Sequence, residues 1–124
     1  MSKTIFIIDD ALTMLMSIST MLNIEGYKVE SANDGITALN KLESGLKPDL
    51  IITDLNMPKM GGMELIPKIR ALPGFRFTPI LILTTESAGA KRDEAKKVGA
   101  TGWLTKPVKS ETLIGAIKKV LPGA

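Results

Sequence analysis

The 124-residue sequence contains neither cysteine nor histidine, and these two absences exclude most reactive chemistry at once. Without cysteine there is no disulfide, thiolate metal site or thiol nucleophile, and we expect a cytoplasmic protein. Without histidine no imidazole acts as general base, metal ligand or phosphate carrier. Any bound metal is therefore expected to be a hard cation held by oxygen, such as Mg²⁺, Mn²⁺ or Ca²⁺.

Long apolar runs are also missing. No segment approaches the roughly 18 apolar residues that a membrane span needs, and the chain does not start like a signal peptide. The composition is 44% hydrophobic and 23% charged, which is ordinary for a globular protein. We expect a single domain over residues 1–124, a monomer, with no membrane partner.

The net charge of +3 is unevenly distributed. Residues 87–124 contain eight Lys and Arg against three acidic residues, a net charge of +5, which leaves −2 for residues 1–86. This excess is interpreted either as solvated helix faces or as a surface for acidic partners. Basic residues without interleaved aromatics are weak evidence for nucleic-acid binding, and we expect no nucleic-acid partner.

Five short apolar runs alternate with five helical patterns. Three runs are continuous in Ile, Leu and Phe, which is typical of parallel strands buried on both faces. This alternation predicts an α/β fold, a doubly wound parallel sheet of order 2-1-3-4-5 with five helices. The runs are "KTIFII" (3–8), "YKVES" (27–31), "DLIIT" (49–53), "PILIL" (79–83) and "TGWLT" (101–105).

Helical spacing of apolar residues predicts the faces that pack on the sheet. Turn residues agree with these helices: Gly26 follows the first, Asn33-Asp34-Gly35 opens the second and Gly99 closes the fourth. The apolar sets are Met14, Leu15, Ile18, Met21 and Leu22, then Ile36, Leu39 and Leu42, and later Leu113, Ile114, Ile117, Val120 and Leu121.

Polar residues follow each central strand at the edge where a doubly wound sheet binds ligands. Asp9-Asp10 follow the first strand, Asp54 the third, Thr84-Thr85 the fourth and Lys106-Pro107 the fifth. Each alone has an ordinary explanation, such as Asp10 capping the first helix. Their joint occurrence indicates a site.

Three clustered carboxylates repel one another unless a cation lies between them. Mg²⁺ suits few carboxylates with waters and a phosphate, and Mn²⁺ is a possible substitute. A carboxylate nucleophile beside a metal, a lysine and a hydroxyl is the equipment for phosphoryl transfer to aspartate. The lysine and hydroxyl here are Lys106 and Thr84.

Four motifs, in order and over essentially the whole chain, resemble the receiver domains of two-component response regulators, most closely the stand-alone chemotaxis (CheY-type) proteins. They are "IFIIDD", "ITDLNMPKMGG", "ILILTTE" and "GATGWLTKPV". The resemblance implies a signalling phosphoacceptor that catalyses its own phosphotransfer and slow dephosphorylation. It also implies a histidine kinase, of the CheA type, and a downstream target such as the flagellar motor switch.

The resemblance further implies a role for each site residue. Asp54 would accept the phosphoryl group, and Asp10, Asp54 and the backbone carbonyl of Asn56 would ligate Mg²⁺. Asp9 would reach the metal through water.

Lys106 would pair with the phosphoryl group, Thr84 would be the switch hydroxyl, and the Lys106–Pro107 peptide would be cis. Asn56 and Glu86 would form a rim that admits water. Trp103 stands where Tyr or Phe is usual, and Val108 where Phe is common. The indole is larger than the usual ring, and the alternative interpretation of Trp103 is a half-buried edge residue.

Other functions compete less well. A haloacid-dehalogenase-type phosphatase needs a second Asp where this chain has Asn56, and it needs a cap domain. A flavodoxin-like FMN carrier needs a phosphate loop, but "DDALTM" places two negative charges there. A DNA-binding regulator needs a second domain. A single-domain phosphorelay or sink receiver outside motility remains the alternative.

Overall fold

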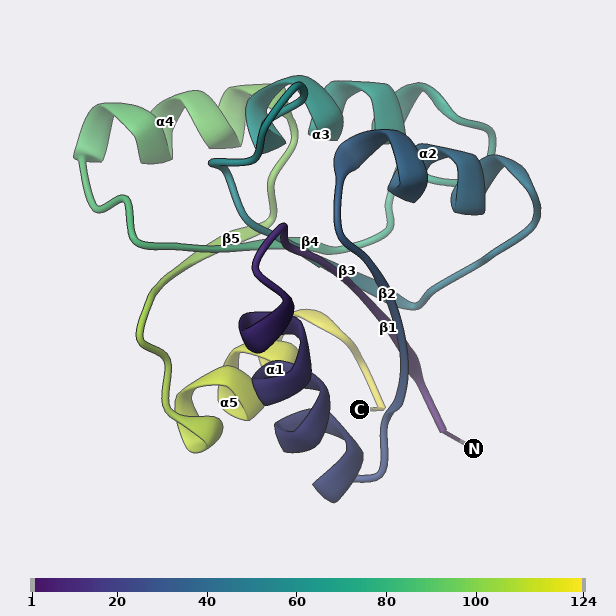
Figure 1. Ribbon diagram of the computed structural model, residues 1–124, viewed down its shortest axis with the longest axis vertical. Coiled ribbons are helices and arrows are strands. Elements are labelled where there is room, and N and C mark those ends of the chain that lie inside the picture. Colours follow the sequence, from purple (N-terminus) through teal and green to yellow (C-terminus); the bar gives the residue numbers. More distant parts are fainter. Residues whose placement is uncertain (1, 124) are drawn as a thin grey trace.

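The computed structural model describes residues 2–123, and its centre is a five-stranded parallel sheet (Figure 1). The strands are β1 (Thr4–Ile8), β2 (Lys28–Ala32), β3 (Leu50–Thr53), β4 (Ile80–Thr84) and β5 (Gly102–Thr105). Their order is β2-β1-β3-β4-β5 and every pair is parallel, which confirms the predicted fold class. All carboxyl ends therefore meet at one edge.

Helices cover both faces of the sheet (Figure 1). On one face lie α1 (Leu12–Ile24) and α5 (Ser110–Val120). The other carries α2 (Gly35–Glu43), α3 (Gly62–Ala71) and α4 (Gly89–Val98). None of the helices described within residues 2–123 is both long enough and apolar enough to cross a membrane.

Side chains of the continuous apolar strands pack into two separate hydrophobic cores, one on each face of the sheet. In β1, Phe6 and Ile8 pack with the core beneath α2, α3 and α4, whereas Ile5 and Ile7 pack with the core beneath α1 and α5. The strand is buried on both faces because successive side chains point to opposite sides. Each such side chain stabilises the fold by about 1.5–3 kcal/mol when fully buried.

Two helix ends follow the turn chemistry that the sequence predicts. Asp34 is the N-cap of α2, and its Oδ1 accepts a hydrogen bond from Thr37 N at 2.6 Å. The backbone hydrogen bond from Thr37 holds the pKa of Asp34 below its usual value. Gly99 ends α4 at φ 113°, in the left-handed region where glycine is favoured.

One predicted apolar face is wrong in part. The helical spacing predicts that Ile36 faces the core, but its side chain is 50% exposed. The helix begins at Gly35, and Ala38 and Leu42, four residues apart, turn toward the sheet. Ile36 lies in the first turn away from that stripe.

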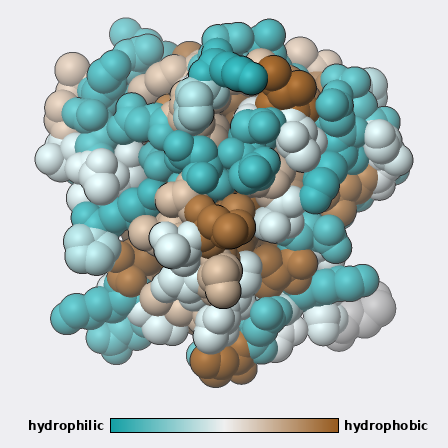
Figure 2. Space-filling model, in the orientation of Figure 1, coloured by the Kyte–Doolittle hydropathy of each residue, from teal (hydrophilic) through white to brown (hydrophobic). Residues whose placement is uncertain are grey.

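The solvent face of α1 carries no charge. No Asp, Glu, Lys or Arg occurs between Leu12 and Ile24, and three large apolar side chains of the helix are exposed: Leu12, Met16 and Ile24. Figure 2 shows hydrophobic side chains gathered in the middle and at the lower edge of this face. Since α1 begins two residues after Asp10, it borders the acidic edge of the sheet with an uncharged surface.

Candidate functional site

The carboxyl ends of β1 and β3 bring three carboxylates together. Asp9 and Asp10 follow β1, Asp54 follows β3, and one carboxylate oxygen from each lies within 4.8 Å of the other two. Asp9 and Asp54 are only 3% and 8% exposed, whereas Asp10 faces solvent. The site therefore contains two buried carboxylates and a third carboxylate that is accessible from solvent.

Lys106 bridges the two buried carboxylates. Its Nζ donates to Asp9 Oδ2 at 2.7 Å and to Asp54 Oδ2 at 2.9 Å, and its side chain is 10% exposed. Burial by itself lowers the pKa of Lys106, but the hydrogen bonds to Asp9 and Asp54 outweigh it, so the pKa is raised. The lysine is therefore a fixed cation at the centre of the site.

Backbone groups orient the carboxylates further. Asn56 N donates to Asp54 Oδ1 at 3.2 Å, and Ala11 N donates to Asp9 Oδ1 at 2.9 Å. These bonds hold each oxygen in one direction, since a bonded carboxylate loses rotational freedom. Asn56 itself is exposed at the rim.

The structure corrects one interpretation of Asp10. The N-cap of α1 is Ala11, without a side-chain cap bond, and it is Asp9 that accepts from the Ala11 amide. Asp10 therefore does not cap the helix. Among residues 2–123, no side-chain hydrogen bond or ion pair to Asp10 is present, so its carboxylate is available to a cation.

Thr84 lies at the carboxyl end of β4 with no exposed surface. Its Oγ1 accepts a hydrogen bond from Glu86 N at 3.3 Å. Its backbone oxygen accepts from Lys106 N at 2.7 Å, which ties the ends of β4 and β5 together. Glu86 is half-buried at the rim.

Two adjacent glycines allow the loop after Asp54 to pack against the end of β3. A Cβ on Gly61 would lie 2.6 Å from the Leu55 oxygen, and one on Gly62 would lie 2.7 Å from the Asp54 oxygen. Both contacts are to backbone, so no side chain fits. Gly61 has a φ of −80°, which any residue can adopt, so the backbone conformation does not require glycine there. Glycine is required because there is no space for a Cβ atom. Lys59 instead takes the left-handed conformation, at φ 69°.

The carboxylates fit a hard divalent metal. Three oxygen donors lie within one small volume, two of them buried and directed by hydrogen bonds. Oxygen-only donor sets suit Mg²⁺, which keeps several waters in its shell. The Lys106–Pro107 peptide beside this site is cis, as expected.

The sequence of this chain matches a known protein family over most of its length. The family model described as the response regulator receiver domain matches residues 5–118. The chain belongs to that family. Receivers are signalling phosphoacceptors that bind Mg²⁺ at an acidic pocket and act with a histidine kinase and a downstream target.

The relatives include chemotaxis proteins and a transcriptional regulatory protein. The chain is 35% identical to the chemotaxis protein CheY1 of Helicobacter pylori over 94% of this chain and 95% of that one. It is similar to the structure of chemotaxis protein CheY4 of Vibrio cholerae, with a TM-score of 0.93, 42% identity and coverage of 98% and 100%. It is 36% identical to the transcriptional regulatory protein CpxR homolog of Haemophilus influenzae, over 98% of this chain but only 51% of that longer relative.

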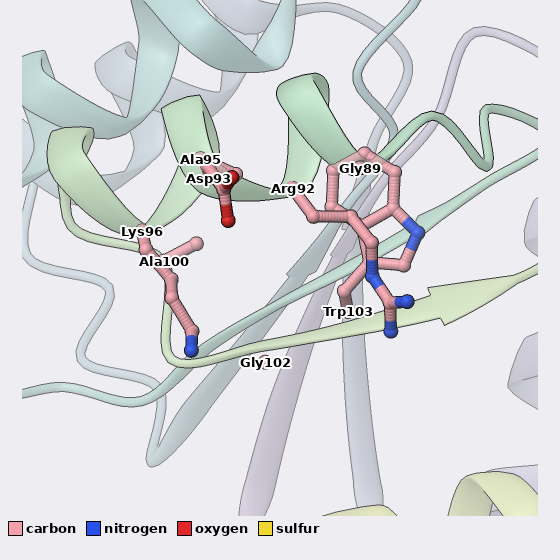
Figure 3. Close-up of a pocket in the computed structure, with 8 residues that line it drawn as sticks. All are labelled: Gly89, Arg92, Asp93, Ala95, Lys96, Ala100, Gly102 and Trp103. Atoms are coloured by element: carbon pink, nitrogen blue, oxygen red, sulfur yellow. The ribbon is translucent and has the colours of Figure 1, made fainter.

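The receiver has a second notable region, a groove between α4 and β5. A cavity of about 370 Å³ lies there, with Arg92 and Lys96 from α4 on one side and Trp103 from β5 on the other (Figure 3). Trp103 is half-buried on the edge strand. Its Nε1 is buried and has no hydrogen-bond partner among the described residues.

Sequence reasoning missed Arg70, which connects distant parts of this receiver. Its guanidinium donates to the Gly99 oxygen through Nε at 3.1 Å and Nη2 at 2.8 Å. Nη1 donates to the Phe75 oxygen at 2.8 Å and to the Thr78 oxygen at 2.6 Å. Arg70 thus holds the end of α4 against the loop before β4. A lone arginine near a helix end carries no sequence signal for this role.

Proposed function

We propose that this receiver accepts a phosphoryl group on Asp54 from a phosphohistidine of a CheA-type kinase and then controls a partner protein in chemotaxis, at the flagellar motor switch. The observation that carries the proposal is the Lys106 bridge between Asp9 and Asp54 inside a three-carboxylate cluster. A fixed cation beside a directed carboxylate is what phosphoryl transfer to aspartate requires.

In the proposed step, a carboxylate oxygen of Asp54 attacks the phosphorus atom and forms the acyl phosphate. The bond from phosphorus to the donor imidazole nitrogen breaks, and its electron pair stays on that nitrogen. Asp10, Asp54 and the Asn56 carbonyl, with Asp9 through water, would hold Mg²⁺, and the bound ion would neutralise charge on the phosphoryl oxygens.

This chain's own residues do the rest. Lys106 exchanges its bond to Asp54 for one to a phosphoryl oxygen, which needs little movement because Nζ lies 2.9 Å from the accepting carboxylate. The Thr84 hydroxyl would turn from the Glu86 amide to another phosphoryl oxygen, which links the chemistry to the β4–α4 loop. Asn56 and Glu86, at the rim, would admit and orient the water that later removes the group.

The proposed output surface is the face formed by α4, β5 and α5. It carries most of the positive charge of the C-terminal part of the chain, with Lys91, Lys96 and Lys118 exposed and Trp103 half-buried. An acidic segment of the target would complement this face. Reversing the charge at these three lysines is expected to abolish phosphorylation-dependent partner binding.

A phosphorelay or sink receiver outside motility is the second candidate. The similarity to a receiver in a transcriptional regulator supports keeping it, because one receiver fold serves several outputs. The two candidates differ in the fate of the phosphoryl group. A relay receiver passes it to a second histidine-containing protein, whereas a motor regulator loses it to water.

Labelling with acetyl phosphate and Mg²⁺ tests the assignment of Asp54. The unmodified protein is expected to be labelled and Asp54→Asn is expected to take no label. Asp93→Asn, an exposed carboxylate change on α4, is the matched control and should label normally. Stoichiometric labelling of Asp54→Asn would show that the acceptor lies elsewhere.

A further inference from the structure

The interface between α4 and β5 is poorly filled. Within α4 only the small residue Ala95 is fully buried, and the larger Val98, which is partly buried, packs against the core only at the end of the helix. The neighbouring lining residues Ala100 and Gly102 are also small, and a cavity of about 370 Å³ remains beside Trp103 (Figure 3). The indole therefore has free space next to it.

The indole of Trp103 is not held by its polar atom. Buried Trp N–H groups usually find an acceptor. Here Nε1 is buried and unpaired within residues 2–123. No hydrogen bond holds the ring in this position, and burial of the unpaired N–H is unfavourable. The position of the ring therefore depends on the contacts that neighbouring side chains make with its two faces.

Arg92 supplies such a contact. Its Cζ lies 5.9 Å from the centroid of the Trp103 ring, and in Figure 3 its side chain runs from α4 across the indole. None of the side-chain hydrogen bonds or ion pairs found in the described part of the chain involves Arg92. Among the described residues, the cation–π contact with Trp103 is therefore the one directed polar or aromatic interaction found for Arg92, and a planar guanidinium suits an aromatic face.

We propose that Arg92 is a positioning residue that holds the Trp103 ring between α4 and β5 in the unphosphorylated protein. Loss of this contact releases the ring to move relative to the cavity.

Trp103 is the only tryptophan, so its fluorescence reports this ring alone. Acrylamide quenching of the unphosphorylated protein is compared for the unmodified chain, Arg92→Ala, Arg92→Lys and Lys96→Ala. Lys96 lines the same cavity and carries the same charge but is not stacked on the ring, so it is the matched control. Arg92→Ala is expected to raise the exposed population of the ring about two- to fivefold, as an exposed cation–π contact implies.

Arg92→Lys should fall between these values, because lysine keeps the charge but not the planar group. Lys96→Ala should leave quenching unchanged. Equal quenching in Arg92→Ala and Lys96→Ala, with the same thermal midpoint, would overturn the role of Arg92. This comparison uses no phosphate, so it stands even if Asp54 proves not to be the acceptor.

Discussion

The acidic site and the α4–β5 groove lie on the same sheet but are built in opposite ways. At the site, Asp9, Asp54 and Lys106 are buried and joined by bonds of 2.7 and 2.9 Å. In the groove, small residues leave a cavity and the Trp103 N–H has no partner among the described residues. One region has a single arrangement of its polar atoms, and the other has space and an unsatisfied donor.

The acidic site is suited to a chemical reaction, whereas the α4–β5 groove is suited to a change of conformation. A reacting carboxylate needs a fixed position, because misplacement of the attacking atom costs rate. A surface that changes shape needs a second arrangement of similar free energy, and loose packing lowers the cost of reaching one. Substitutions at the acidic site are therefore expected to have large effects on labelling and on stability, and substitutions in the groove are expected to have small effects on both.

Removing the central cation should have the largest effect. Lys106→Met leaves Asp9 and Asp54 buried without their bridging cation and removes the charge that would face the phosphoryl group in the proposed step. The rate of labelling by acetyl phosphate is expected to fall about 100-fold or more. Lys109→Met, at an exposed lysine nearby, is the control and should label at the normal rate. A fall of similar size in both would indicate a nonspecific charge effect.

Adding a side chain at Gly62, where the loop packs against the backbone of Asp54, should reduce stability and labelling nearly as strongly. In Gly62→Ala the new Cβ meets the backbone oxygen of Asp54 at 2.7 Å, so the end of β3 must shift. We expect a loss of about 1–3 kcal/mol in the free energy of unfolding, together with slower labelling of Asp54. Urea denaturation measures the first and acetyl phosphate labelling the second. Unchanged stability would show that this loop tolerates displacement.

The rim should set how long the phosphoryl group lasts. Replacing Asn56 by Met and Glu86 by Leu excludes water from the exposed side of Asp54, so hydrolysis should slow several-fold while Asp54 remains phosphorylatable. Glu94→Leu, an acidic residue of α4 outside the rim, controls for loss of charge. Decay that is equal or faster in the double variant would remove the rim from the mechanism.

The ion pairs of Lys106 with Asp9 and Asp54 should also make the free energy of unfolding depend on pH, which can be measured in the absence of divalent metal. The pKa of Lys106 is raised in the folded protein. Its contribution is therefore complete below the pKa of unfolded lysine, about 10.4, and is lost as pH rises through the higher folded value. The gap in unfolding free energy between the unmodified protein and Lys106→Met should narrow in that range. A constant gap would contradict the ion bridge.

The smallest effect is expected in the groove. Gly89 is the first residue of α4, and a Cβ added there would meet no atom within 4 Å, unlike one added at Gly62. Gly89→Ala should raise the free energy of unfolding by about 0.4–1 kcal/mol, chiefly by restricting the unfolded chain, and leave labelling unchanged. A destabilisation as large as that of Gly62→Ala would remove the contrast between the two regions.

Local patterns were sufficient for the architecture. Continuous apolar runs predicted central parallel strands, and β1, β3 and β4 are buried as expected. The residues that follow each strand included Asp9, Asp54 and Lys106, because all parallel strands end at one edge. The same patterns failed at Ile36, since periodicity specifies a face but not which turn of a helix meets the sheet.

The residue types at the strand ends can be identified from the sequence alone, and they indicate the family. The folded structure was needed to find that Lys106 bridges Asp9 and Asp54, that Asp9 and not Asp10 accepts from the Ala11 amide, and that Arg92 lies over the Trp103 ring. The physical reason is range. Strand and helix periods are set by neighbours a few residues apart, whereas these contacts join segments whose distance depends on strand register and on how closely loops approach the sheet.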